Sequence, residues 1–203
     1  GMLKAIGKAD IPVIAHSTLF RPHYFTEPAL KHVGVPRGSA PPELDRFARL
    51  VLLDRPFSLM PGVISTGEVK RAVEFEKNLT LRLLTEENGA LVPDEMKDDL
   101  SLIIEIEDQG LVIVTGCSHA GIVNIVNHSI ELTGEKRIQA VIGGLHLVDA
   151  DEDRIEKTAK ALYDLDVKTL YVGHCTGLRG EASLLSQFKD RLFKLHSGMR
   201  IEL

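Results

Sequence analysis

Cysteine and long apolar runs are scarce in this sequence, and each shortage excludes a class of protein. Two cysteines, Cys117 and Cys175, are too few for the disulfide framework of a small secreted protein. No uninterrupted apolar run approaches the roughly 18 residues that suggest a membrane span. Residues 1–10 lack the long apolar core of a signal peptide. We therefore expect a cytoplasmic protein with no membrane partner.

Basic residues are in the minority. The 203 residues include 24 Lys and Arg against 29 Asp and Glu, which gives a formal net charge of −5. Nonspecific nucleic-acid binding needs a basic face that displaces counterions from the phosphates, so we expect no nucleic-acid partner. The hydrophobic content of 44% is that of a soluble globular protein with a substantial core.

The first half of the chain shows no regular alternation of strand and helix patterns. Residues 1–99 contain all nine prolines, which interrupt helices and central strands. Here we expect a short strand at 11–15, an amphipathic helix over 43–53, two strands within 57–69, and a solvated loop over 85–99.

From residue 100 the pattern is regular and predicts an α/β fold. Residues 101–107 and 111–115 are expected to form a hairpin. Strands then alternate with helices, which favours a layered α/β architecture. The helices are expected over 121–132, 152–165 and 180–193, with a final edge strand over 199–203.

Three histidines follow three of these strands at the same relative position: His119, His146 and His174. The carboxyl ends of neighbouring parallel strands share one edge of a sheet, where ligands bind. Imidazole is a common neutral metal ligand and titrates near physiological pH. The pattern predicts a metal or acid–base site, although a single histidine at a strand end is more often structural or exposed to solvent.

The loops around these histidines are also rich in glycine. The helices that start at Gly121 and after Thr176 point free backbone N–H groups at the same edge, and such helix N-termini suit an anion such as phosphate. The sequence contains neither a Walker motif nor G-x-G-x-x-G. It therefore predicts a generic anion site and no dinucleotide fingerprint.

Three motifs occur in an order and spacing that resembles one branch of the metallo-β-lactamase superfamily. They are GLVIVTGCSHAGIVNIV (110–126), VIGGLHL (141–147) and YVGHCTG (171–177). That branch contains metal-dependent hydrolases and an archaeal dihydropterin–ribofuranosylaminobenzene phosphate synthase. The resemblance covers most of the chain. It implies an α/β fold of the metallo-β-lactamase-like αββα sandwich type, with a metal site on one edge of the paired sheets.

The resemblance also implies a set of metal ligands. His174 matches the last metal-binding histidine of the superfamily, and His119 matches the middle histidine ligand of this branch. Cys117 stands near the position of a bridging aspartate in many relatives, and is either a ligand or a small buried filler. Cys175 is interpreted as a packing residue. The expected cofactor is a divalent metal, zinc first, with manganese, iron or magnesium as alternatives.

Other positions are expected to contact the substrate. His146 is typical of this branch, and we interpret it as a catalytic acid–base or substrate-binding group more than as a ligand. Ser118, Gly121 and Thr176 are expected to bind a substrate phosphate, the first and last through their hydroxyl groups.

The H-x-H-x-D-H motif that defines the superfamily does not occur in the sequence. The nearest histidines, His16 and His23, have the wrong spacing. We therefore expect residues 1–203 to form a single, N-terminally incomplete metallo-β-lactamase-like domain, truncated before an irregular part (1–99) and a regular part (100–203). Missing strands would leave an open sheet edge. We expect a homo-oligomer, or a partner chain that supplies the missing part.

Two functions remain open at this point. The first is a metal-dependent hydrolase or transferase that acts on a phosphate-bearing small molecule, with catalysis impaired by the absent motif. The second is a non-catalytic module that binds an anion or small molecule and retains the fold without the metal. Elemental analysis of the purified protein would distinguish the two.

Overall fold

The computed structural model divides the chain into two compact units. Unit 1 is drawn from Gly1–Arg55 and Thr80–Asp98, and unit 2 from Pro56–Leu79 and Asp99–Leu203. Every site residue predicted from the three motifs lies in unit 2. The residues that the structure describes are 11–36, 41–44, 46–77 and 83–203.

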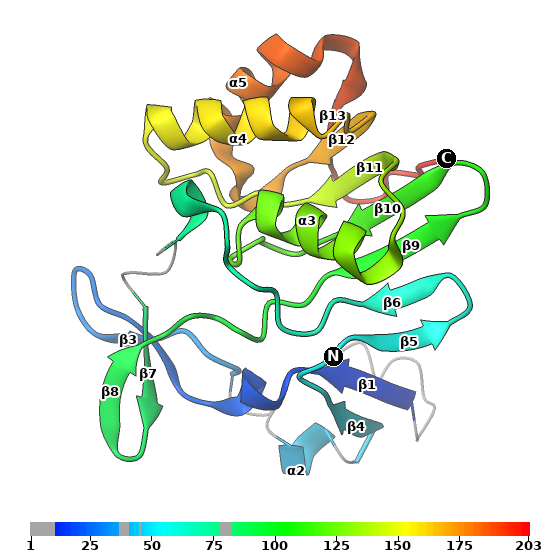
Figure 1. Ribbon diagram of the computed structural model, residues 1–203. Helices are drawn as coiled ribbons and strands as arrows, with labels where there is room; N and C mark the ends of the chain where they lie inside the picture. Colours follow the sequence, from blue (N-terminus) through cyan, green and yellow to red (C-terminus); the bar gives the residue numbers. More distant parts are fainter. Residues whose placement is uncertain (1–10, 37–40, 45, 78–82) are drawn as a thin grey trace. The chain divides into compact units, whose positions relative to one another are not determined.

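Unit 2 is built on a seven-stranded mixed sheet in the order β13-β12-β11-β10-β9-β6-β5 (Figure 1). Strands β10 to β13 run parallel to one another, and β5, β6 and β9 join them in antiparallel pairs. The carboxyl ends of β10, β11 and β12 therefore meet at one edge, as the sequence predicts. The strands are β5 (Phe57–Met60), β6 (Val63–Ser65), β9 (Leu102–Ile106), β10 (Gly110–Val114), β11 (Ile138–Gly143), β12 (Thr169–Val172) and β13 (Leu192–Lys194).

Each parallel strand of this sheet except the last leads into a helix. The helices are α3 (Ile122–Thr133), α4 (Glu152–Asp164) and α5 (Gly177–Phe188), with short 3₁₀ turns η2 (Glu74–Glu76), η3 (His174–Thr176) and η4 (Lys189–Arg191). The α4 helix lies beside both α3 and α5 (Figure 1). The Asp151 carboxylate caps α4 by accepting the N–H of Arg154 at 2.8 Å. All three predicted helices are confirmed, although α5 begins at Gly177.

The core of unit 2 lies between the sheet and these helices. Strand β10 is buried on both faces, as expected for a strand in the middle of a covered sheet. Its Leu111 and Ile113 pack in one cluster with Ile122 and Ile125 of α3 and with Leu170 of β12, all fully buried. This packing fixes the strands whose ends carry the predicted site.

Unit 1 contains two small sheets. Strand β1 (Ile11–Ala15) pairs in parallel with β4 (Ala48–Leu52). An antiparallel sheet in the order β3-β2-β7-β8 forms the remainder. Its strands are β2 (His23–Phe25), β3 (Lys31–His32), β7 (Leu83–Glu87) and β8 (Ala90–Pro93), accompanied by η1 (Ser17–Phe20) and α2 (Pro41–Leu44).

Three of the predicted elements are wrong. The helix expected over 43–53 is replaced by α2 and β4, because pairing with β1 outweighs the amphipathic pattern. The loop expected over 85–99 contains the β7–β8 hairpin, whose two turn residues, Asn88 and Gly89, both have positive φ as tight hairpins require. Residues 199–203 form no strand, and the edge strand is β13. The strands at 11–15 and within 57–69 are confirmed.

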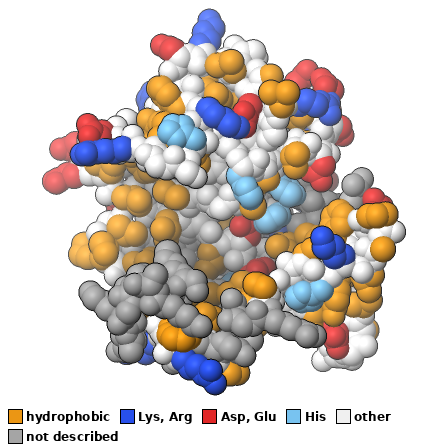
Figure 2. Space-filling view, turned by 180° about the vertical axis from the view of Figure 1, so that it is seen from behind, with side chains coloured by type: hydrophobic (Ala, Val, Ile, Leu, Met, Phe, Trp, Pro, Cys, Tyr) orange, Lys and Arg blue, Asp and Glu red, His pale blue; other side chains and the backbone are white. Residues whose placement is uncertain are grey.

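The surface carries charged side chains of both signs, as the composition predicts. On the face drawn in Figure 2, Lys and Arg side chains are separated from one another by acidic or uncharged surface. None of the helices in the described ranges is long and apolar enough to span a membrane.

Candidate metal centre

Three loops meet at the carboxyl ends of β10, β11 and β12, and we call residues 115–121, 144–148 and 173–177 the site edge. Backbone hydrogen bonds join them. The N–H of Gly144 donates to the Gly116 carbonyl at 3.0 Å, and the N–H groups of Leu147 and Val148 both donate to the Cys175 carbonyl at 3.0 Å. The three loops are therefore held as one unit.

One non-glycine residue in each loop adopts a left-handed backbone conformation. The φ angles are 60° at Ser118, 48° at His146 and 51° at His174. Such residues each cost on the order of 1–3 kcal/mol and tend to cluster at functional sites. Two of the three are predicted functional histidines, so the backbone supports a functional site independently of the side chains.

Cys117, His174 and Cys175 form a potential metal-binding group at this edge. Their ligand atoms all lie within 4.8 Å of one another. Nε2 of His174 is 3.1 Å from Sγ of Cys117, and the Cys175 thiol donates to the Cys117 carbonyl at 3.4 Å. Zinc binds sulfur and imidazole at about 2.0–2.3 Å, so donors on one ion lie less than about 5 Å apart. The donor types and their spacing fit a single zinc ion.

The two thiols of this group share a hydrogen bond that separates their proton affinities. The interaction with Cys117 lowers the pKa of Cys175, with further lowering from His146, while burial opposes the shift. The same interaction, together with burial, raises the pKa of Cys117. A metal binds the thiolate form of cysteine, so metal binding by this group would displace a thiol proton.

The rings of His119 and His146 are in contact beside this group, with centroids 4.5 Å apart and planes tilted by 60°. The backbone N–H of His119 donates to the Asp99 carboxylate, which also lies 3.5 Å from the His119 Nδ1. A carboxylate beside a histidine commonly fixes its orientation and tautomer. In the described part of the chain, His119 belongs to no group of three or more potential ligands.

The backbone of His146 is anchored by a half-buried arginine. Nη2 of Arg154, in the first turn of α4, donates to the His146 carbonyl at 2.7 Å. Burial lowers the pKa of Arg154, opposed by the charges of Glu76, Asp149 and Asp151. Arg154 stays protonated at physiological pH because a guanidinium group is not deprotonated in proteins. It therefore holds the left-handed residue His146 in place.

The predicted phosphate-binding residues are engaged within the protein. The fully buried hydroxyl of Ser118 donates to the Gly144 carbonyl at 2.7 Å, and the fully buried hydroxyl of Thr176 accepts the N–H of Leu145 at 3.1 Å. Both hydroxyls tie the loops of the site edge together. Contact between these residues and a substrate phosphate stays a prediction.

The helix N-terminus at Gly121 already holds an anion from the chain itself. The carboxylate of Glu76 accepts the N–H groups of Val123 and Asn124 at 2.9 and 2.8 Å. A Cβ atom at Gly121 would collide with that carboxylate. Burial raises the pKa of Glu76 to about 7, although the hydrogen bonds from α3 oppose the shift. This carboxylate occupies the position where the sequence predicts phosphate.

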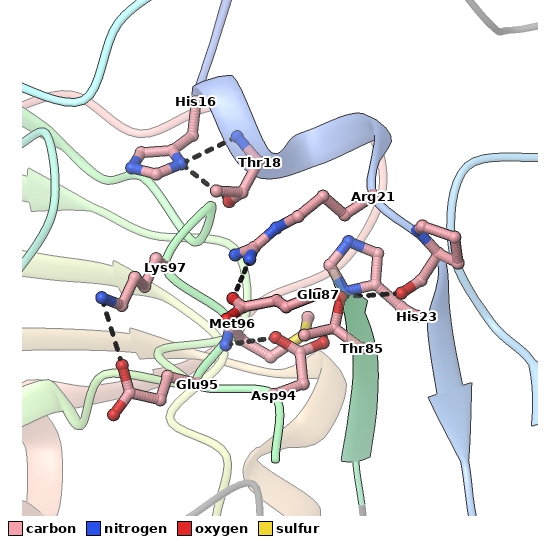
Figure 3. Close-up of polar contacts among 11 residues, drawn as sticks. His16, Thr18, Arg21, His23, Thr85, Glu87, Asp94, Glu95, Met96 and Lys97 are labelled. Carbon is pink, nitrogen blue, oxygen red and sulfur yellow. Dashed lines mark hydrogen bonds and ion pairs between the residues drawn. The ribbon is translucent and has the colours of Figure 1, made fainter. Parts of the chain in front are cut away.

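His16 and His23, the histidines nearest to the position of the absent motif, lie in unit 1 (Figure 3). Nδ1 of His23 is 2.5 Å from Oδ2 of Asp94, and both residues are almost fully buried. Nδ1 of His16 accepts the N–H of Thr18 at 3.2 Å and lies 2.8 Å from its hydroxyl. Each histidine thus has a defined polar partner within its own unit.

Four residues at or near the site edge were not among the site residues predicted from the sequence: Glu76, Asp99, Arg154 and Cys175. The first three come from segments that no motif marks, and long-range folding brings them to the edge. Cys175 was interpreted as packing, although it is the third member of the potential metal-binding group. Its position next to His174 was the available signal.

Comparison with known proteins places these features in a family. No protein-family model matches the chain. Over its whole length it is 40% identical to the 7,8-dihydropterin-6-methyl-4-(beta-D-ribofuranosyl)-aminobenzene-5'-phosphate synthase of Methanocaldococcus jannaschii, and it covers 69% of that protein. It is 28% identical, over 89% of its length, to an uncharacterized protein of the same archaeon and covers 64% of it.

A solved structure gives the same result for the fold. The chain superposes over its full length on the crystal structure of Tm1679, a metal-dependent hydrolase of the β-lactamase superfamily, with a TM-score of 0.84 and 26% identity, covering 74% of that chain. The predicted metallo-β-lactamase-like α/β fold is confirmed. The chain belongs to the metallo-β-lactamase superfamily, in the branch represented by the M. jannaschii synthase.

Proposed function

We propose that the protein is a metal-dependent hydrolase or transferase that acts on a phosphate-bearing small molecule. The observation that carries the proposal is the group of Cys117, His174 and Cys175 at the site edge, beside the contacting rings of His119 and His146. The name of the M. jannaschii relative includes a phosphate group, and Tm1679 is described as metal-dependent. Both descriptions agree with the chemistry of the edge.

Zinc is the metal that suits these donors best, and Cys117 and His174 are the ligands on which sequence and geometry agree. His119 is a further ligand by resemblance, held toward the edge by Asp99. A bound divalent metal would lower the pKa of a water molecule and polarise a phosphoryl or carbonyl oxygen. Manganese, iron and magnesium remain alternatives for the same site.

His146 is proposed as the acid–base group. Its half-buried imidazole lies beside His119, and Arg154 fixes its backbone. A general acid or base must be held within hydrogen-bonding reach of the reacting atoms, at a pKa near the working pH. Imidazole is the side chain that most often performs this role.

Metal binding tests the proposal directly. The purified protein, stripped with a chelator and reconstituted with zinc, is expected to retain close to one ion per chain by elemental analysis. Cys117→Ser and His174→Ala are expected to lose most of it, and His128→Ala, which changes a histidine of α3 outside the site edge, to keep it. Cobalt substitution adds a spectroscopic readout, because thiolate ligation gives an intense near-ultraviolet band that Cys117→Ser would remove.

Hydrolysis of p-nitrophenyl phosphate by the zinc-loaded protein tests the catalytic part. Activity that disappears in His146→Ala while zinc is retained supports the assignment of His146. A protein that takes up no metal after reconstitution contradicts the proposal and favours the non-catalytic binding module.

The assembly state is a further part of the proposal. The group of Cys117, His174 and Cys175 supplies three donors, and we propose that a second copy of the chain, or a partner chain, contributes to the complete site. The protein is also proposed to be cytoplasmic, in agreement with its two free thiols. Light scattering that finds a monomer at micromolar concentration would contradict self-association.

A further inference from the structure

The only two cysteines of the chain lie next to each other although they are 58 residues apart. Cys117 follows β10 and Cys175 follows β12, so two different loops of the site edge bring them together. Their sulfur atoms lie within 4.8 Å, and Cys175 donates to the Cys117 carbonyl at 3.4 Å. A disulfide bond needs sulfurs about 2.05 Å apart, so the two sulfurs have to approach each other by less than about 3 Å.

The local packing leaves both thiols partly accessible, and Gly144 makes space for the Cys175 sulfur. Both cysteines are only partly buried, unlike the sealed and unreactive cysteines of a core. Gly144 lies against Cys175, and a Cβ atom there would be 2.7 Å from the Cys175 sulfur and 2.8 Å from the Gly116 carbonyl oxygen. The absence of a side chain at Gly144 therefore provides the space that this sulfur occupies.

We infer that Cys117 and Cys175 form a reversible disulfide bond by exchange with a small-molecule disulfide, and that this bond excludes metal from the site edge. One protein thiolate attacks the small disulfide, forms a mixed disulfide and releases one small thiol. The second cysteine then attacks the mixed disulfide, forms the Cys117–Cys175 bond and releases the other small thiol. Two protein thiols are oxidised, one small disulfide is reduced, and the two protons leave on the released thiols.

The disulfide bond would exclude metal because it removes donors that the metal needs. Formation of the bond consumes two of the three donors of the potential metal-binding group and leaves His174 alone. A metal that holds both sulfurs would in turn block attack on the small disulfide. In a reducing compartment such a bond is transient and regulatory more often than structural. The inference holds whether or not the protein is an enzyme.

Thiol counting and mass spectrometry test the bond itself. The reduced, metal-free protein is incubated with oxidised glutathione and then denatured. We expect the free thiols to fall from two per chain to none, with the mass of two hydrogens lost and a peptide that joins residues 117 and 175. Dithiothreitol is expected to restore both thiols. Cys117→Ser and Cys175→Ser are the matched controls, and each is expected to gain one glutathionyl group with no internal link.

Zinc protection tests the exclusion. At zinc a hundredfold above its dissociation constant, the oxidation rate is expected to fall roughly a hundredfold, because only the metal-free fraction reacts. The inference is overturned if both thiols persist in excess oxidised glutathione, or if the wild-type chain yields only mixed or interchain disulfides. Equal zinc affinity of the oxidised and reduced forms would overturn the exclusion even where the disulfide bond forms.

Discussion

Gly144 and Gly116 face each other across the site edge, but only one of them needs to be glycine. A Cβ at Gly144 would meet the Cys175 sulfur and the Gly116 carbonyl oxygen, whereas a Cβ at Gly116 has nothing within 4 Å. We expect Gly144→Ala to lower the free energy of unfolding by about 1–3 kcal/mol through overpacking, and to weaken zinc binding. Gly116→Ala is the control, expected to change both little. Urea unfolding and zinc titration compare the two variants, and equal effects would show that Gly144 has no special role.

The buried pair His23–Asp94 is the second feature that belongs to single residues. The hydrogen bond to Asp94 raises the pKa of His23 against the effect of burial. Burial alone would raise the pKa of Asp94, but hydrogen bonds from His23 and from the Met96 N–H lower it below its ordinary value. The His23 contribution is complete below its unfolded pKa of 6.5 and is lost as pH rises through the higher folded value. The Asp94 contribution is present above its unfolded value of 3.8 and is lost as pH falls through the lower folded one.

We therefore expect this pair to stabilise the protein most between about pH 4 and 6.5. Removing one partner leaves an uncompensated buried group, so His23→Gln or Asp94→Asn should cost on the order of 3–5 kcal/mol within that window. Denaturant unfolding at several pH values measures the loss. The double variant should lose less free energy of unfolding than the sum of the two single losses. Strictly additive losses would mean that the residues act separately.

Candidate ligands within a motif could be predicted from the sequence, but which of them lie together in space could not. His174 was predicted because it follows a recognisable strand, and Cys117 because it matches the position of a bridging aspartate in the family it resembles. Cys175 was missed because neighbouring side chains of a strand point to opposite faces. The chain has already left β12 at Val172 and turns into η3 with a left-handed His174, which brings the two neighbouring side chains into one group.

At the scale of elements, η2 and the start of α3 are joined by reciprocal caps. The Glu76 carboxylate accepts two N–H groups of α3, and the Asn124 side chain of α3 accepts the N–H groups of Ala72 and Val73, both at 2.9 Å. This clamp positions the loop that carries Cys117 and His119. It also explains why the N-terminus of α3, which looked like a phosphate site in the sequence, is filled.

Glu76 should make stability depend on pH in a direction opposite to an ordinary carboxylate. Its folded pKa of about 7 lies above the ordinary value of 4.5, so the folded state binds more protons over that range. Stability is therefore highest below about pH 4.5 and is lost as pH rises through 7, by about 3 kcal/mol in total. In Glu76→Gln this dependence should vanish, while the exposed Glu74→Gln keeps it. Urea unfolding from pH 5 to 8 gives the comparison, and parallel curves for wild type and Glu76→Gln would refute the assignment.

Regular elements were predicted well where local pattern and packing agree. The three strand–helix units follow from periodicity and from glycine at the helix ends, as at Gly134, which ends α3 with a φ of 76°. Strand β4 was missed because its identity depends on β1, more than 30 residues earlier in the chain. The β7–β8 hairpin had a local signal in Asn88-Gly89 that its charged surroundings obscured.

At the scale of the whole molecule, the two units combine segments that are distant in sequence. Pro56–Leu79 belongs with the later half because β6 pairs with β9, for example Val63 with Ile104. The change from irregular to regular sequence near residue 100 coincides with one of the boundaries between the two units. The remaining boundaries follow from long-range strand pairing, which a single sequence does not reveal.

Metal binding should be visible in the stability of the folded chain. A ligand that binds only the folded state at a hundred times its dissociation constant adds about 2.7 kcal/mol to the free energy of unfolding. We expect this increment for zinc with the wild-type protein and its loss in His174→Ala, while His128→Ala retains it. Thermal unfolding with and without zinc measures it. An identical increment in His174→Ala would place the metal elsewhere.

The left-handed residues of the three loops also limit how far the protein can be stabilised by mutation. Glycine adopts the φ angles of Ser118, His146 and His174 without a steric penalty. A variant selected only for heat resistance would therefore tend to replace these residues and lose the side chains of the site edge. The site edge therefore keeps a backbone strain that lowers stability, because two histidines and a buried serine occupy positions that glycine would fill without strain.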